Sequence, residues 1–345
     1  MPSDYGYINA RIRGQHSQLL KPGAYQELAG LSGYPPLEKW METSPYSKQW
    51  QLAKVRYQGL EALEWSLEKN FCQATELLLK IAEKQPQQLI TIVLRRWDLS
   101  NLVAIARGIH GGWATAEILK SVLPAGGIGE IKLKELASQP DMAGLADTLY
   151  TWGDEFYLPF KEILAVYQKD KIIAAVEVEL YKYYFRQVLK DLPLFGKNSR
   201  VLKDIFGKEI DFLNAKALKR LRGKKDLNPA LLMNHYIPGG NLFTKAEFIN
   251  YFDRKEGPKI LKALKGTIYY PFLSGSSPDT DSEENLEQAH FQELARLYQG
   301  DPLGIDLVLG YLWQKYYEII NLRLLARGKF YGIPSEQILG ELKLF

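Results

Sequence analysis

Residues 97–107 read WDLSNLVAIAR, and this stretch decides the fold because it recurs. Its apolar residues follow helical spacing, yet it also contains an aspartate, an asparagine and an arginine. The same residue types stand at the same spacing in IDFLNAKALKR at 210–220 and YEIINLRLLAR at 317–327. Buried polar groups require partners. The three matching sets therefore indicate either three copies of a site or one structural unit used three times.

The match extends well beyond these segments, which indicates an internal triplication. A shift of 113 residues aligns the first copy with the second over more than sixty residues, with the pairs Glu64 and Glu177, Leu67 and Leu180, Lys69 and Lys182, Phe71 and Tyr184, Ala104 and Ala217, and Leu119 and Leu232. A further shift of 107 carries the same pattern into the third copy. We therefore expect three similar domains, at 1–127, 128–240 and 241–345.

The fold class expected is all-α. Segments such as 59–84 and 169–192 carry apolar residues at helical spacing, and alternating strand patterns are few. A repeat of about 110 residues can hold its own core. Three such domains favour a pseudo-threefold body over an open solenoid, whose units are usually ~20 to 50 residues long. The acidic, Ser-rich stretch at 274–284 is predicted to be a mobile surface loop.

The repeated polar positions are the candidate functional residues. They are Asp98, Asn101, Arg107, Asp211, Asn214, Arg220, Glu318, Asn321 and Arg327. At ~100° per residue the acid and the amide share a helical face, whereas the arginine lies on the opposite face, so the acid and the arginine of one copy cannot meet. A basic residue three positions before each acid (Arg95, Lys208, Lys315) predicts a weak i, i+3 pair.

Two interpretations of these positions stand side by side. The carboxylates could be catalytic or could form one composite metal site, but no nucleophile or base recurs beside them. The interpretation favoured here is structural, with the polar groups locking helices or domains together. Other sites find little support: His16, His110, His235 and His290 lack ligand spacing, and Cys72 reads as a core thiol. We expect no catalytic residue, no cofactor and no metal.

Composition limits the possible partners. The net charge of +4 is mild for 345 residues, so nucleic-acid binding is not expected. The single cysteine and the absence of an apolar leader favour a reducing, cytosolic setting. Apolar runs such as 89–94 and 307–313 are much shorter than the ~18 to 20 residues that span a bilayer, so a soluble chain is expected.

Three stretches together carry a resemblance to a known family. They are DYGYINARIRGQHSQLL at 4–20, VLRRWDLSNLVAIAR at 93–107 and EIINLRLLARGKFYGIPSEQILGEL at 318–342. With the triplication, the chain resembles the C subunits of the archaeal and bacterial V-type (A-type) rotary ATPases, the counterparts of the d subunit of the eukaryotic V-ATPase. The resemblance covers essentially the whole chain.

The resemblance implies a funnel of three helical domains that sits on the membrane rotor ring and holds the foot of the central axle. Its partners would be the axle subunits and the ring, with membrane contact only through the ring, on the cytoplasmic face. Such a subunit transmits torque and is not an enzyme. Two other functions stay open: a free-standing helical scaffold that recruits protein partners, and an enzyme with a site between domains.

Overall fold

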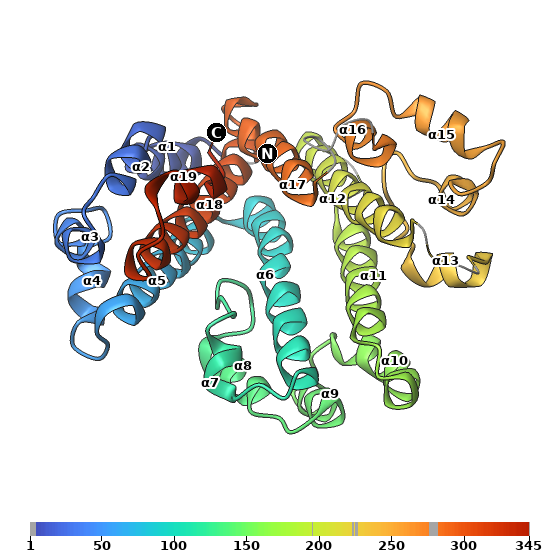
Figure 1. Ribbon diagram of the computed structural model, residues 1–345, viewed down its shortest axis with the longest axis horizontal. Helices are drawn as coiled ribbons and strands as arrows, with labels where there is room; N and C mark the ends of the chain where they lie inside the picture. The colour runs from blue at the N-terminus through green and yellow to red at the C-terminus, as the bar shows by residue number, and fades with distance from the viewer. Residues whose placement is uncertain (1–4, 195, 223, 225–226, 276–281, 345) are drawn as a thin grey trace. The chain divides into compact units, whose positions relative to one another are not determined.

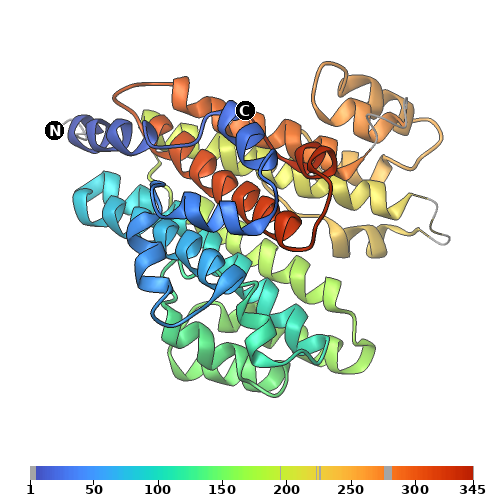
Figure 2. The same cartoon turned by 60° about the vertical axis from the view of Figure 1, so that its left-hand side comes forward.

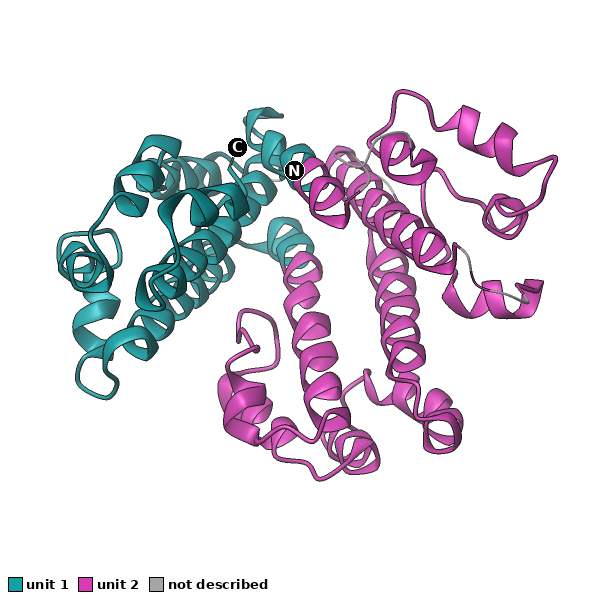
Figure 3. Cartoon of the chain, in the orientation of Figure 1, with its two compact units in different colours: residues 1–90, 291–345 teal, residues 91–290 magenta. Residues whose placement is uncertain are grey.

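The computed structural model describes residues 5–194, 196–222, 224, 227–275 and 282–344. All regular structure in these ranges is helical, which confirms the all-α class. The helices are labelled in Figure 1, and the two compact units into which the chain divides are shown in Figure 3. Unit 1 combines residues 1–90 with 291–345, and unit 2 comprises residues 91–290.

Unit 1 brings together two segments that are far apart in the sequence, 1–90 and 291–345. Its helices are α1 (Tyr5–His16), α2 (Pro22–Ala29), α3 (Tyr34–Met41), α4 (Ser47–Ala53), α5 (Gly59–Ile81), η1 (Arg296–Gln299), α18 (Asp306–Phe330) and α19 (Ser335–Glu341), together with the start of α6 (Lys84–His110) and the end of α17 (Glu283–Ala295). Figures 1 and 2 both place α18 beside α5, and α18 also packs against η1 and α1.

The core of unit 1 forms around α18. Every residue from Leu307 to Lys315 is buried, so this part of the helix is enclosed on all sides. A helix that is apolar around its whole circumference belongs in a core, which accounts for the long apolar run in its sequence. Within the described ranges, no helix combines the length and apolar character needed to cross a membrane.

Unit 2 holds the remaining helices. They are most of α6, then α7 (Thr115–Leu119), α8 (Glu130–Ala137), α9 (Met142–Thr151), α10 (Tyr157–Asp170), α11 (Ile173–Asp191), α12 (Lys197–Leu221), α13 (Pro229–His235), α14 (Lys245–Asn250), α15 (Gly257–Ala263), α16 (Tyr269–Ser274) and the start of α17. Helices α10 and α11 pack together, and α12 contacts α11 and α16. An aromatic cluster that includes Phe243, Phe248, Tyr269 and Phe272 packs against Leu218 of α12.

The loop predicted at 274–284 falls mainly outside the described residues, since 276–281 are not among them. On either side of that gap, α16 ends at Ser274 and α17 begins at Glu283.

Helices α6 and α18 end in the same kind of turn. The amide of Trp113 donates to the carbonyl of Gly108, and the amide of Ile333 donates to that of Gly328, at 2.9 and 2.8 Å. The residue before each donor, Gly112 or Gly332, has a positive φ, as is usual where a left-handed residue closes a helix.

The glycine at the start of each of these turns permits close packing. A Cβ atom on Gly108 would lie 2.4 Å from the side chain of Ile118, and one on Gly328 would lie 2.5 Å from that of Ile338. Such distances are far below van der Waals contact. Each short helix, α7 or α19, therefore rests directly on the backbone of the long helix before it.

His290 is a buried histidine in α17 of unit 2. It lies seven residues after Glu283, as Phe71 and Tyr184 lie seven residues after Glu64 and Glu177. Its ring stacks on Phe212, with centroids 4.6 Å apart. The pKa of His290 is lowered to about 3, mainly by burial and in addition by the charges of Arg96 and Lys208, while Glu287 opposes them.

This lowered pKa predicts acid sensitivity. At pH values between the pKa of the unfolded histidine, ~6.5, and that of folded His290, the histidine is protonated only in the unfolded chain. The contribution of neutral His290 to the free energy of unfolding is therefore full above pH ~6.5 and is lost as the pH falls below it. Lowering the pH from 7 to 5 is expected to cost the wild-type protein roughly 1 to 2 kcal/mol more than a His290→Phe variant. Urea unfolding of both proteins at the two pH values measures this, and parallel losses would contradict it.

Candidate functional site

The carboxylate of the first polar set holds a backbone turn. Asp98 lies on α6, is buried, and accepts the amides of Gly127 and Ile128 at 2.8 Å each. Burial raises its pKa, the two backbone hydrogen bonds partly offset this rise, and the resulting pKa is about 6. Gly126 allows the close approach, because a Cβ atom there would lie 2.2 Å from Oδ1 of Asp98.

The second carboxylate repeats this arrangement. Asp211 on α12 is fully buried and accepts the amides of Asn241, Leu242 and Phe243 at 2.8 to 3.2 Å. A Cβ atom on Gly240, just before the first donor, would lie 2.2 Å from Oδ1 of Asp211. Gly126 and Gly240 are therefore the places where a carboxylate meets the main chain.

The third carboxylate binds a backbone amide from the other end of the sequence. Oε2 of Glu318 on α18 accepts the amide of Leu20 at 2.5 Å. Its Oε1 accepts Nζ of Lys315 at 2.9 Å and the hydroxyl of Tyr46. Lys315 and Glu318 are both buried, and Lys315 also donates to the Tyr46 hydroxyl. The third set thus adds a buried ion pair that the first two lack.

The asparagine of each set makes one recurring contact. Its side-chain amide donates to a backbone carbonyl, and its side-chain oxygen accepts the amide of the same residue. The pairs are Asn101 with Leu123, Asn214 with Ile237 and Asn321 with Lys343, at 2.8 to 2.9 Å. Each asparagine therefore pairs both backbone groups of a residue that lies beyond the end of its own helix.

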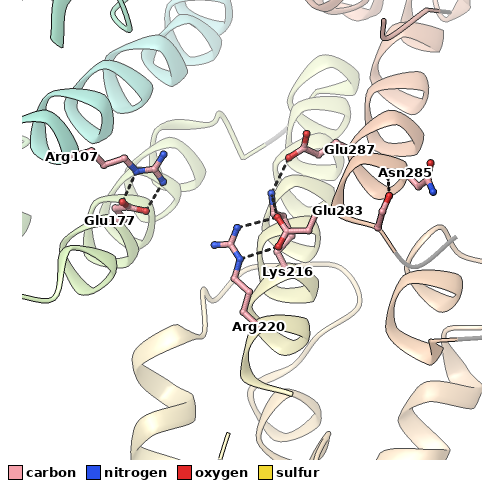
Figure 4. A network of polar contacts seen from close by, with 8 residues as sticks. Arg107, Glu177, Lys216, Arg220, Glu283, Asn285 and Glu287 are labelled. Atoms are coloured by element: carbon pink, nitrogen blue, oxygen red, sulfur yellow. Dashed lines mark hydrogen bonds and ion pairs between the residues drawn. The ribbon is translucent and has the colours of Figure 1, made fainter. Parts of the chain in front are cut away.

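The arginines point to other helices. Arg107 forms a bidentate ion pair with Glu177 of α11 at 2.6 and 2.7 Å, and Arg220 forms one with Glu283 of α17 at 3.0 Å (Figure 4). The third arginine, on α18, pairs with a glutamate of α5: Nε of Arg327 lies 2.5 Å from Oε1 of Glu64. As expected from the helical spacing, no arginine of these sets contacts the acid of its own set in the described contacts.

Sequence reasoning missed a second group of ion pairs beside the first. Lys216, one turn before Arg220, pairs with Glu283 and Glu287 at 2.9 Å each (Figure 4). Arg323, one turn before Arg327, pairs with Glu68 at 3.2 Å. Lys216 and Arg323 each lie four residues before an arginine of the polar sets, and this spacing is visible in the sequence.

A further missed pair has one buried member. Arg96 of α6 donates to Glu209 of α12, which is buried and lies 113 residues later in the sequence. Burial raises the pKa of Glu209, whereas Arg96 opposes this.

The predicted i, i+3 pairs are present in one of the three copies. Lys315 contacts Glu318 as expected. The prediction was wrong for the other two, because Arg95 pairs with Asp191 at 2.5 Å and Lys208 pairs with Asp204 at 3.2 Å. Asp98 and Asp211 instead accept backbone amides.

The described contacts of the polar sets are all made to other parts of the same chain. Each carboxylate and amide is engaged by backbone groups or by a buried ion pair, and each arginine by a glutamate. Within the described ranges no three His, Cys, Asp or Glu residues are grouped so as to hold a metal ion. Cys72 is buried in α5.

Comparison with known proteins gives the family. The family model described as "ATP synthase (C/AC39) subunit" matches residues 8–341. The chain belongs to the ATP synthase (C/AC39) subunit family. Among curated members of similar sequence, the C subunit of the V-type ATP synthase of Deinococcus radiodurans is 26% identical, with 99% of this chain and 92% of the relative aligned. The C subunit of the V-type ATP synthase of Thermus thermophilus is 28% identical, with 98% of each aligned.

An archaeal relative of the C/AC39 family is similar to the same extent. The C subunit of the A-type ATP synthase of Archaeoglobus fulgidus is 26% identical, with 97% of this chain and 94% of the relative aligned. The resemblance inferred from the three sequence stretches is thereby confirmed at the level of the family.

The asparagine contacts generate a stability prediction. Replacing Asn101 with Ala leaves the buried amide of Leu123 unpaired, whereas the Leu123 carbonyl still accepts the amide of Ala125 at 2.8 Å. The loss of these contacts should lower the free energy of unfolding by roughly 1 to 3 kcal/mol. Ser100→Ala is the matched control, since Ser100 is exposed on the same helix and should change stability by less than about 0.5 kcal/mol. Urea unfolding measures both. Equal stabilities of the two variants would remove the structural role of Asn101.

Proposed function

We propose that this chain is a non-catalytic rotor subunit of a V-type or A-type ATPase. In this role it couples the central axle to the membrane rotor ring and transmits torque between ATP hydrolysis or synthesis and ion translocation. Its partners are the axle subunits and the ring, and it lies on the cytoplasmic face of the membrane, which it meets only through the ring. It needs no cofactor, metal or nucleic acid for this.

Family membership supports the assignment to the complex. The curated relatives align with this chain along almost their whole length and are named as the C subunits of V-type or A-type ATP synthases. The described contacts of the repeated polar sets support the non-catalytic role, since those side chains hold backbone and neighbouring helices.

The observation that carries the proposal is the order of the inter-repeat contacts. With domains at 1–127, 128–240 and 241–345, Arg107 of the first pairs with the second, Arg220 of the second pairs with the third, and Arg327 of the third pairs with the first. In a linear string of three domains no domain follows the third, so Arg327 would have no following domain with which to pair. The cyclic order supports the triplication and a funnel about a pseudo-threefold axis.

The carboxylates follow the same order. Asp98 holds the backbone at the start of the second domain, Asp211 that of the third, and Glu318 that of the first, through Leu20. Two independent kinds of contact therefore link each domain to the next. A socket that carries torque requires such links, because domains that yield under load would dissipate the rotation of the axle.

A free-standing scaffold that recruits protein partners is the alternative function. A scaffold would share the helical fold and the polar sets. The two functions therefore differ in whether ATP-driven ion pumping depends on the chain. An enzyme with a site between domains would require grouped titratable side chains, and within the described ranges no three His, Cys, Asp or Glu residues are grouped so as to hold a metal ion.

The deciding experiment is reconstitution of the rotary complex with and without this chain. We expect ATP-driven ion pumping to be lost without the chain while the catalytic head still hydrolyses ATP. The readout is the number of ions pumped for each ATP hydrolysed. Pumping at an unchanged ratio without the chain would contradict the coupling role and favour the scaffold.

Variants of the inter-repeat arginines sharpen this test. Combined replacement of Arg107, Arg220 and Arg327 with Ala should lower the pumping ratio, because each removes a link between domains. Lys120→Ala is the matched control, since Lys120 forms its ion pair with Glu117 within one short segment. An exposed pair contributes only ~0.2 to 1 kcal/mol, so all variants should remain folded.

A further inference from the structure

Helix α1 is held differently from the rest of the N-terminal segment. It packs against α18, which is far away in the sequence. Its buried side chains are Tyr5, Ile8, Asn9 and Ile12, and the other residues of the helix are exposed or half-buried. Three apolar side chains, Tyr5, Ile8 and Ile12, therefore fix α1.

The described side-chain hydrogen bonds from α1 to the rest of unit 1 are made by Asn9 and His16. Nδ2 of Asn9 donates to the carbonyls of Pro302 and Gly304 at 2.9 and 3.0 Å. The ring of His16 stacks on Tyr298 with centroids 3.7 Å apart, and its Nε2 lies 2.7 Å from Oε1 of Gln314.

Docking of α1 also leaves polar atoms without partners. The hydroxyl of Tyr5 and Oδ1 of Asn9 are buried and have no hydrogen-bond partner in the described part of the chain. Each such atom costs ~1 to 3 kcal/mol, and both would be hydrated if α1 came away. The helix is 12 residues long and includes Gly6 and Gly14, so it is marginal on its own.

The segment that follows is anchored far more firmly. Oε2 of Glu318 accepts the Leu20 amide at 2.5 Å. Lys329, itself buried, donates to the carbonyls of Ala29 and Leu31, and Tyr46 binds the buried pair of Lys315 and Glu318. Breaking these contacts would leave buried charges unpaired, which is strongly unfavourable.

We infer that residues 5–19 form a strap that detaches from α18 as one unit, hinged at Leu20, while α2, α3 and α4 stay bound. Detachment uncovers the carbonyls of Pro302 and Gly304 and the ring of Tyr298. The strap also exposes its own apolar side chains, with Arg11 and Arg13 on its outer face. This is a property of the isolated chain and does not depend on the proposed function.

Native-state hydrogen exchange of the full-length chain tests the strap directly. The α1 amides of Asn9 to Arg13 should exchange together, with protection factors at least roughly tenfold below those of Leu20 and of α2 and α18. Low concentrations of urea should leave this difference visible. Equal protection of α1 and α18 would overturn the inference, and so would exchange of Leu20 and α2 in step with α1.

Two variants of the same helix separate strap release from general loosening. Asn9→Ala removes both bonds to the Pro302 and Gly304 carbonyls and should speed α1 exchange by about tenfold, with α2 and α18 unchanged. Arg11→Ala, on the exposed face, is the matched control and should leave α1 exchange as in wild type. Equal effects of the two variants, or an Asn9→Ala effect that spreads to α18, would contradict a separable strap.

Discussion

The need to satisfy a buried carboxylate organises this protein. A carboxylate inside a helical core is strongly unfavourable unless donors surround it. Asp98 and Asp211 obtain those donors from main-chain amides, and each arrangement requires a glycine whose missing side chain lets the acid approach. The acid therefore fixes the course of the chain as it leaves one long helix and enters the next part of the fold.

Asn101 and Arg107 of the same helix fix two further parts of the chain. Asn101 pairs both main-chain groups of Leu123, so the end of the α6 turn is fixed at a second point. Arg107 reaches outward to Glu177. One helix thus uses three polar side chains for three tasks: the acid holds the start of the next segment, the amide holds the exit of its own, and the arginine holds a neighbouring helix.

The sequence was sufficient to predict the helical class from the spacing of its apolar residues, and the family from three of its stretches. It could not show the partners of Asp98 and Asn101, since backbone groups carry no side-chain signature. The partner of Arg107 was visible in part: Glu64 and Glu177 matched in the repeat, yet nothing linked them to the arginines. The buried cluster of Tyr46 and Lys315 on Glu318 joins residues too far apart in sequence to be paired by pattern.

The central claim is that the third polar set links back to the first repeat as the other two link forward. Double-mutant cycles on the three arginine–glutamate pairs measure this most directly, with the pair of Arg327 and Glu64 as the decisive one. We predict a stabilising coupling energy of similar size, about 0.3 to 1 kcal/mol, for all three pairs. Coupling for the first two pairs with none between Arg327 and Glu64 would contradict the cyclic account.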